Sequence, residues 1–147
     1  MSVGTRLPAH ATVLGHALLA DHSLAQLRAL YPDEQLAQRG AQTPADATAL
    51  FELVKQVRAR GHVISDAFYE AHISTVAAPV FGDGNHVVAA IGLTVPGSRV
   101  PDEQRAPLVA AVCGAAAELS ALLNYAEPAR APAEADKPRA VSSRQQA

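Results

Sequence analysis

The pattern of hydrophobic and polar residues is helical in the middle of the chain. Apolar residues recur at the i, i+3, i+4 and i+7 positions of one helix face: Leu50, Leu53, Val54 and Val57. This spacing is typical of a helix that packs one side against a core. Thr43 is a favourable residue to cap the start of a helix and Gly61 a favourable residue to end one, so we predict a helix between them.

Two further helices are predicted before this one. Residues 9–20 are rich in alanine and leucine, and Gly15 marks a point of close packing. The inward-facing leucines expected there are Leu14, Leu18 and Leu19. Residues 23–30 form a second, shorter helix capped by Ser23, and it ends at Tyr31 because a residue before proline avoids helical backbone angles.

The last part of the sequence divides into a helix and a tail. Residues 102–125 are apolar almost all round, so we expect this helix to be covered on more than one side. Residues 127–147 are rich in proline, alanine and serine, with no large side chain beyond Val141. Such a segment cannot bury enough apolar surface to offset its ordering entropy. We therefore predict a folded domain over residues 1–126 and a disordered tail over 127–147.

Residues 73–99, ISTVAAPVFGDGNHVVAAIGLTVPGSR, have the pattern of a β-hairpin. Two apolar runs flank the sequence GDGN, whose residues tolerate the positive backbone angles of a tight turn. Pro79 has no amide hydrogen, so its strand is expected to lie partly at an edge or a bulge. A short strand at residues 62–64 precedes the hairpin.

The hairpin also contains small and polar residues where bulky ones would be usual. The two-residue period of a strand places Thr75 and Ala77 on one face, and it places Gly92 with Thr94 on one face of the return strand. Two interpretations are open. The short side chains allow a helix to approach the sheet closely, or they leave a gap with hydroxyl groups pointing into it, which suits a small polar ligand.

The composition argues against several classes of function. The 147 residues carry a net charge of −2, so the chain lacks the concentrated basic surface that grips nucleic acid or an anionic membrane. Cys113 is the only cysteine, which excludes an intrachain disulfide. No apolar run approaches the roughly 18–20 residues that span a bilayer. We therefore expect a cytoplasmic protein without membrane contact.

No pattern of residues predicts catalysis or a metal site. The six histidines are scattered without a HExxH-type pairing, and neither a glycine-rich phosphate loop nor a nucleophile elbow is present. Cys113 lies among alanines and is expected to serve in packing or a subunit contact. Asp66 and Glu70 are close in sequence, but two carboxylates in a loop are usually solvated. We expect neither an enzyme nor a cofactor.

Two long motifs resemble the effector-binding domain of IclR-type transcriptional regulators. VGTRLPAHATVLGHALLA, residues 3–20, resembles the family segment G-x-R-x-P-L-H-x-T-A-x-G-K-A-x-L-A. VRARGHVISDAFYEAHISTVAAPVF, residues 57–81, resembles the following block, which ends in A-A-P-V-f. The resemblance covers residues 3–125. It implies an α+β, GAF/PAS-like fold, in which helices pack on a curved antiparallel sheet that holds a small carboxylate-type or aromatic effector.

The resemblance also implies a set of effector-binding residues. Carried over by position, they are Val13, Leu14, Ser65, Ile73, Thr75, Gly92 and Thr94. Several positions depart from the family pattern. His16 stands where lysine is usual, His72 where the family has glycine, Ala9 where leucine is common, and Ser65 where some members have aspartate. Val13 and Leu14 are bulkier than the small pair of some members. No catalytic residue and no metal ligand is implied.

A regulatory role follows from the same resemblance. The domain is expected to be N-terminally truncated, lacking the winged helix-turn-helix that binds DNA in the family and the leading strands of the effector domain. We expect it to bind a small organic or aromatic acid and to control DNA binding by a helix-turn-helix outside this chain, without contacting nucleic acid itself. The expected partner is a second copy or a full-length relative. The alternative is a ligand-free dimerisation module that modulates full-length relatives.

Overall fold

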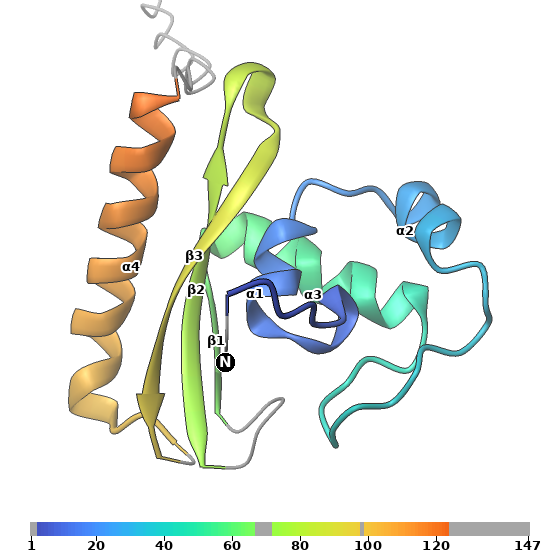
Figure 1. Cartoon of the computed structure of the whole chain (residues 1–147), viewed down its shortest axis with the longest axis horizontal. Helices are drawn as coiled ribbons and strands as arrows, with labels where there is room; N and C mark the ends of the chain where they lie inside the picture. The colour runs from blue at the N-terminus through green and yellow to red at the C-terminus, as the bar shows by residue number, and fades with distance from the viewer. Residues whose placement is uncertain (1–2, 67–71, 98, 124–147) are drawn as a thin grey trace, which may run out of the picture.

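An antiparallel sheet of three strands separates the helices into two layers (Figure 1). The computed structural model describes residues 3–66, 72–97 and 99–123. The strands, in the spatial order β1-β2-β3, are β1 (Val63–Asp66), β2 (Ile73–Phe81) and β3 (Val87–Pro96). The helical segments are η1 (Ala9–Ala11), α1 (Val13–Leu18), α2 (Leu24–Leu30), α3 (Ala47–Arg60), η2 (Asp83–Asn85) and α4 (Asp102–Leu122). Helix α4 covers one face of the sheet, and α1 covers the other with α3 and α2 beyond it. The predicted antiparallel α+β architecture is confirmed.

The predicted hairpin is present, and its turn has the backbone angles that its residues favour. Gly84 has φ 71° and Asn85 has φ 63°. Pro79 lies where β1 no longer reaches, because β1 pairs with β2 only as far as Ala77. A register irregularity follows between Val80 and Phe81. The proline therefore lies in a part of β2 that pairs with β3 only, so its missing amide hydrogen breaks no bond to β1.

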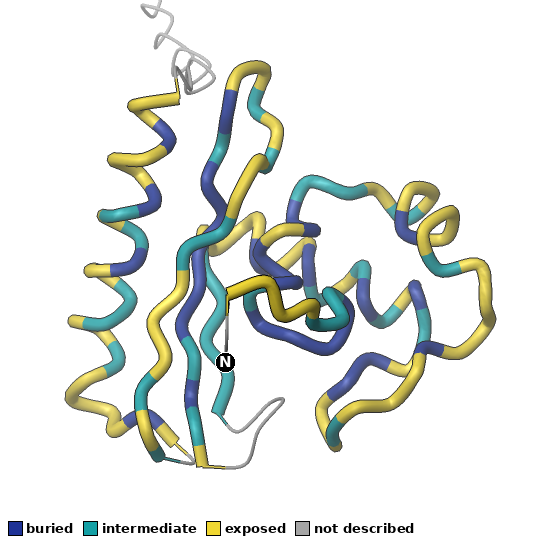
Figure 2. The backbone as a smooth tube through the Cα atoms, viewed as in Figure 1, coloured by how far each residue is buried: buried dark blue, intermediate teal, exposed yellow. Residues whose placement is uncertain are grey.

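The core lies on both faces of β2, which is the most deeply buried strand (Figure 2). On the α4 face, the buried residues are Val76, Ala78, Val80, Val112 and Ala116. On the α1 face they are Val13, Ala17 and Ala77. A third cluster joins α2, α3 and the loops around them: Leu19, Leu27, Leu36, Leu50 and Val54. Cys113 of α4 is half-buried and packs against the buried residues of the α4 face, which agrees with its expected role in packing.

The helix predicted over residues 9–20 is divided at Thr12. This residue has extended backbone angles, and its hydroxyl accepts a hydrogen bond from the Gly15 amide at 3.1 Å, so it caps a new helix. The short segment η1 folds back onto α1, and a side chain at Gly15 would lie 2.1 Å from the Ala9 carbonyl oxygen. Gly15 is therefore the predicted point of close packing. The break also turns Leu18 outward, where 42% of it is exposed, contrary to the prediction.

The ends of the next two helices follow from their caps. Ser23 and Gln26 form the reciprocal hydrogen bonds of a capping box at the start of α2, as the sequence predicted for Ser23. Helix α3 begins later than predicted, because the Asp46 carboxylate caps it through the Ala49 amide at 2.7 Å. Thr43 is instead used within the preceding loop, where its hydroxyl accepts from the amides of residues 39 and 40. Gly61 ends α3 with φ 78°, as predicted.

Helix α4 corrects one expectation. Its length and composition match those of a membrane span, as those of core helices can, and one of its faces packs in the core. It was expected to be covered on more than one side, but its buried residues form a single face: Val112, Ala116 and Ser120. The Ser120 hydroxyl accepts from the Phe81 amide at 3.0 Å and donates to the Ala116 carbonyl at 2.7 Å. The bond from the Phe81 amide fixes the helix to the end of β2.

Residue Glu70 and the predicted tail lie outside the described residues.

We predict that Gly15→Ala destabilises the domain by about 3 kcal/mol, because the new methyl group would overlap the backbone of Ala9. The matched control is Gly114→Ala. No atom lies within 4 Å of a methyl group at Gly114, so this change should stabilise helix α4 by about 1 kcal/mol. Chemical denaturation of both variants measures the two free energies of unfolding. Equal effects of the two substitutions would contradict the close approach at Gly15.

His72 stands where the family pattern has glycine, and its backbone has φ 73°, a left-handed conformation. We predict that His72→Gly raises the free energy of unfolding by about 0.5–1 kcal/mol, since glycine adopts this conformation without strain. His86 has φ −95°, so His86→Gly serves as the control and should lower stability by a similar amount. Thermal or urea unfolding compares them, and a loss of stability in His72→Gly would contradict the prediction.

Candidate functional site

A row of three hydroxyl groups crosses the sheet on the face that α1 covers. Ser65 of β1 pairs with Thr75 of β2, which pairs with Thr94 of β3. The two threonine hydroxyl oxygens lie 3.2 Å apart and are hydrogen-bonded to each other. The Ser65 hydroxyl donates to the side-chain oxygen of Gln42 at 3.3 Å. Ser65 and Thr75 are half-buried and Thr94 is exposed, so this hydroxyl row is accessible from solvent.

The next row along the same face lies beneath α1. It consists of Val63, Ala77 and Gly92. Ala77 is fully buried against Val13, and a side chain at Gly92 would come within 2.9 Å of the Leu14 side chain. Short residues here allow the helix to approach the sheet, which was one of the two interpretations of the hairpin. The hydroxyl row lies beside it on the same face, and whether it binds a ligand stays a prediction.

The structure brings the seven candidate residues to one face with unequal exposure. Leu14 is half-buried over Gly92, next to the hydroxyl row. Ile73 lies at the start of β2, two residues before Thr75 on the same face. Val13 differs from the others, because it is only 5% exposed and packs inside the α1 cluster. Val13 packs between α1 and the sheet and does not contribute to the exposed surface of this face.

Gln42 belongs to the same neighbourhood and was not among the predicted residues. Its side-chain amide donates to the Asp66 carbonyl at 3.2 Å, while its oxygen accepts from Ser65. The residue lies in the polar loop before α3, 24 positions before Asp66 in the sequence. No local pattern marks such a residue. Only the folding of this loop against the end of β1 places it beside the hydroxyl row.

Asp66 is bonded on both carboxylate oxygens, contrary to the expectation that it is solvated. One oxygen accepts from the Val100 amide at 2.9 Å, and the other pairs with the Arg105 guanidinium. Partial burial acts to raise the pKa of this carboxyl, but the hydrogen bonds from Val100 and Arg105 outweigh it and hold the pKa below its usual value. The interaction joins the end of β1, next to Ser65, to the first turns of α4.

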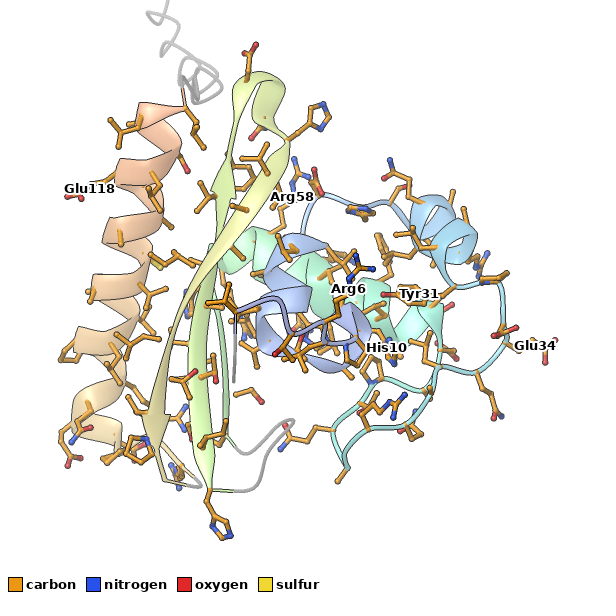
Figure 3. All side chains as sticks on the ribbon, in the orientation of Figure 1. Arg6, His10, Tyr31, Glu34, Arg58 and Glu118 are labelled. Carbon is orange, nitrogen blue, oxygen red and sulfur yellow. The ribbon has the colours of Figure 1, made fainter. Side chains whose placement is uncertain are left out.

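The two buried histidines each donate a hydrogen bond to a backbone carbonyl and so have structural roles. His10 donates from its Nε2 to the Ala37 carbonyl at 2.9 Å, and its ring meets the Tyr31 ring edge-on at 5.4 Å (Figure 3). His16 donates to the His10 carbonyl at 2.8 Å, and burial lowers the pKa of its ring. Within the described residues, no cluster of three or more histidine, cysteine, aspartate or glutamate side chains could hold a metal ion.

Comparison with known proteins places this geometry in a family. Residues 1–121 match the family model for the bacterial transcriptional regulator IclR C-terminal domain. The chain belongs to the IclR family. The resemblance inferred from the two sequence motifs is confirmed, and so is the fold expected from it, an antiparallel sheet with helices on both faces.

Relatives of this IclR-family chain are transcriptional regulators. The HTH-type transcriptional regulator XynR of Escherichia coli is 33% identical over 123 residues, which cover 84% of this chain and 49% of XynR. The structure of the Agobacterium tumefaciens repressor BlcR matches with a TM-score of 0.74 and 29% identity, covering 85% of this chain and 51% of that one. The chain therefore spans about half the length of these relatives.

A third similar protein was solved with a small molecule. The inducer-binding domain of the PobR transcription factor from Acinetobacter, a double mutant in complex with 3-hydroxybenzoic acid, matches with a TM-score of 0.69 and 26% identity. The match covers 82% of this chain and 70% of that one. These relatives are regulators of transcription, in line with the expectation that the chain is not an enzyme.

We predict that Asp66→Ala lowers the free energy of unfolding by about 1–3 kcal/mol at pH 7, because it leaves the Val100 amide and Arg105 without their acceptor. The pKa of Asp66 is lower in the folded chain than in the unfolded chain. Its contribution is therefore complete above the unfolded pKa, about 3.9, and is lost as the pH falls through the folded pKa.

The measurement for Asp66 is urea unfolding of wild type and variant between pH 3 and pH 7. The difference between the two proteins should shrink as the pH falls. Asp33→Ala, a change at an exposed aspartate of the loop after α2, is the control and should have little effect. A difference that is independent of pH would show that the carboxylate does not supply the stabilisation.

Proposed function

We propose that this domain binds a small organic or aromatic acid at the hydroxyl row, and that the bound acid controls DNA binding by a helix-turn-helix carried outside this chain. The observation that supports the proposal is the juxtaposition of Ser65, Thr75 and Thr94 on an accessible part of the α1 face. The complex of the PobR inducer-binding domain with 3-hydroxybenzoic acid supports the same class of ligand.

The chemistry of the row suits a carboxylate. The Thr75 and Thr94 hydroxyls now satisfy each other, and each could instead donate to a bound oxygen. Ser65 donates to the neutral side chain of Gln42 and could exchange this bond for a stronger one to a charged acceptor. Leu14 and Ile73 offer apolar contact on either side, with Val13 behind them. A small acid with an apolar body matches this combination of donors and apolar surface.

Binding at this site could reach distant parts of the domain through two connections. Leu14 belongs to α1, so a ligand that contacts it also acts on the helix. Ser65 precedes Asp66, whose carboxylate is bonded to Val100 and Arg105 at the start of α4. An effector shifts an equilibrium only if it binds one arrangement of these elements better than another. We propose that the position of α4 relative to β1 is the quantity that the effector changes.

The proposal assigns DNA contact to another part of a longer regulator. The chain has a net charge of −2, whereas DNA-binding surfaces are strongly basic. We also propose that the domain acts as an oligomer in the cytoplasm. Strand β3 pairs on one side only among the described residues, and Leu119 and Leu122 of α4 are exposed, as is Leu123 directly after it. An open strand edge and an exposed apolar helix surface both favour association.

We predict that Thr94→Val weakens binding of the effector by about tenfold, because it keeps the shape of the side chain and removes one hydroxyl donor. Calorimetry or thermal shift against a panel of small aliphatic and aromatic carboxylates measures the effect. Thr48→Val, at an exposed threonine of α3, is the matched control and should bind as the wild type does. If no acid binds the wild-type domain, or if Thr94→Val binds as tightly as wild type, the domain is an interaction module without an effector.

A further inference from the structure

A recess separate from the hydroxyl row lies at the β1 edge of the sheet, between the C-terminal half of α3 and β1. It is a hollow of about 140 Å³. Helix α3 contributes Leu53, Gln56, Val57 and Arg60 to its lining, and β1 contributes Val63 and Ile64. We refer to it as the α3–β1 hollow. It shares no residue with the hydroxyl row or with the other effector residues named above, so its occupancy can be examined separately.

The lining of the α3–β1 hollow combines an apolar wall with the guanidinium of Arg60 and the imidazole of His62, whose Nδ1 donates to the Arg60 carbonyl at 3.2 Å. Leu53, Val57 and the two β1 residues supply the apolar surface. Arg60 supplies the charge, and no carboxylate of the described residues lies within ion-pair distance of it. Gln56, one turn earlier on α3, adds an amide donor beside the guanidinium. A planar guanidinium binds a carboxylate through two parallel hydrogen bonds.

The inner wall of the hollow is neutral. His16 of α1 contributes to it, is 2% exposed, and donates from its Nε2 to the His10 carbonyl. Burial lowers the pKa of this ring, so the neutral form is favoured. The Nδ1 of His62 is already bonded to the Arg60 carbonyl, so the Arg60 guanidinium, at the exposed side of the hollow, is the permanently charged group that would select a ligand. A ligand would place its apolar body inward and its charged group outward.

The volume limits the size of the apolar body. An apolar cavity of about 150 Å³ accommodates one benzene ring. The α3–β1 hollow has a similar volume but is open on one side, which leaves space for a substituent that extends toward Arg60. We propose that the α3–β1 hollow is a binding site for a monocarboxylic acid with a single ring or a short aliphatic chain, held by Arg60 and Gln56. This site is additional to the proposed effector site and does not depend on it.

The experiment is a titration of the isotopically labelled chain with benzoate, followed by amide chemical shifts. We expect saturable shifts at residues of α3 and β1 around the hollow. Arg60→Gln should raise the benzoate Kd at least about tenfold, since it removes the charged partner of the carboxylate. The matched control is Arg58→Gln, which changes the net charge equally at an exposed residue of the same helix (labelled in Figure 3). Arg58 is not among the residues that line the hollow. This control variant should change the Kd less than about twofold.

One further variant and one uncharged ligand test whether the carboxylate of benzoate is what Arg60 binds. Gln56→Glu places a carboxylate at the hollow on an exposed position and should also weaken benzoate binding. Benzamide, which has the same ring without the charge, should bind the wild type more weakly and should not respond to Arg60→Gln. Loss of these shifts in Arg60→Gln and Gln56→Glu, with Thr94→Val unaffected, supports the proposal.

Three outcomes would overturn the proposal. The first is that benzoate causes no saturable shift around the hollow. The second is that Arg58→Gln weakens binding as much as Arg60→Gln, which would indicate a general charge effect. The third is that the shifts lie at Thr75 and Thr94 and are abolished by Thr94→Val alone. That third result would leave the proposed effector site intact while removing the second one, so the two proposals fail separately.

Discussion

The close contact between α1 and the β2–β3 hairpin is the constraint on which the rest of this domain depends. Ala77 has only a methyl group and Gly92 has no side chain, so Val13 and Leu14 can reach the sheet. Backbone packing of η1 against Gly15 then holds α1 from its other side. A core layer of this kind tolerates little added volume, because neighbouring atoms are already in van der Waals contact. The position of α1 is thus set by the smallest residues of the chain.

This contact also determines what remains available for binding. The short residues lie beneath α1, and the hydroxyl row begins one strand period further along the same face. Thr75 and Thr94 are consequently next to a helix without being covered by it. At the other end of the row, the Asp66 carboxylate joins β1 to the start of α4. Polar groups that satisfy one another in this way can exchange partners at low cost, as the proposed effector site requires.

The segments that were predicted well are those governed by local backbone chemistry. The capping residue of α2, the glycine that ends α3 and the turn of the hairpin each depend on a few adjacent residues. The errors occur where neighbouring residues offer competing caps, and the sequence does not show which one the backbone uses. Thr43 would cap a helix, but its hydroxyl is used in the preceding loop and Asp46 takes its place. Thr12 divides a segment that composition alone would make one helix.

The sequence by itself determined the family, the hairpin and the alternation that puts Thr75 and Thr94 on one face, because motifs and strand periodicity are properties of neighbouring residues. Tertiary structure alone decided that Val13 is buried, that Gln42 reaches Ser65, and that Asp66 meets Arg105 across 39 positions of sequence. It also decided that α4 covers the sheet with a single face. Such contacts depend on how whole elements dock, and the free energy of docking comes from burial summed over many residues, which no short stretch of sequence records.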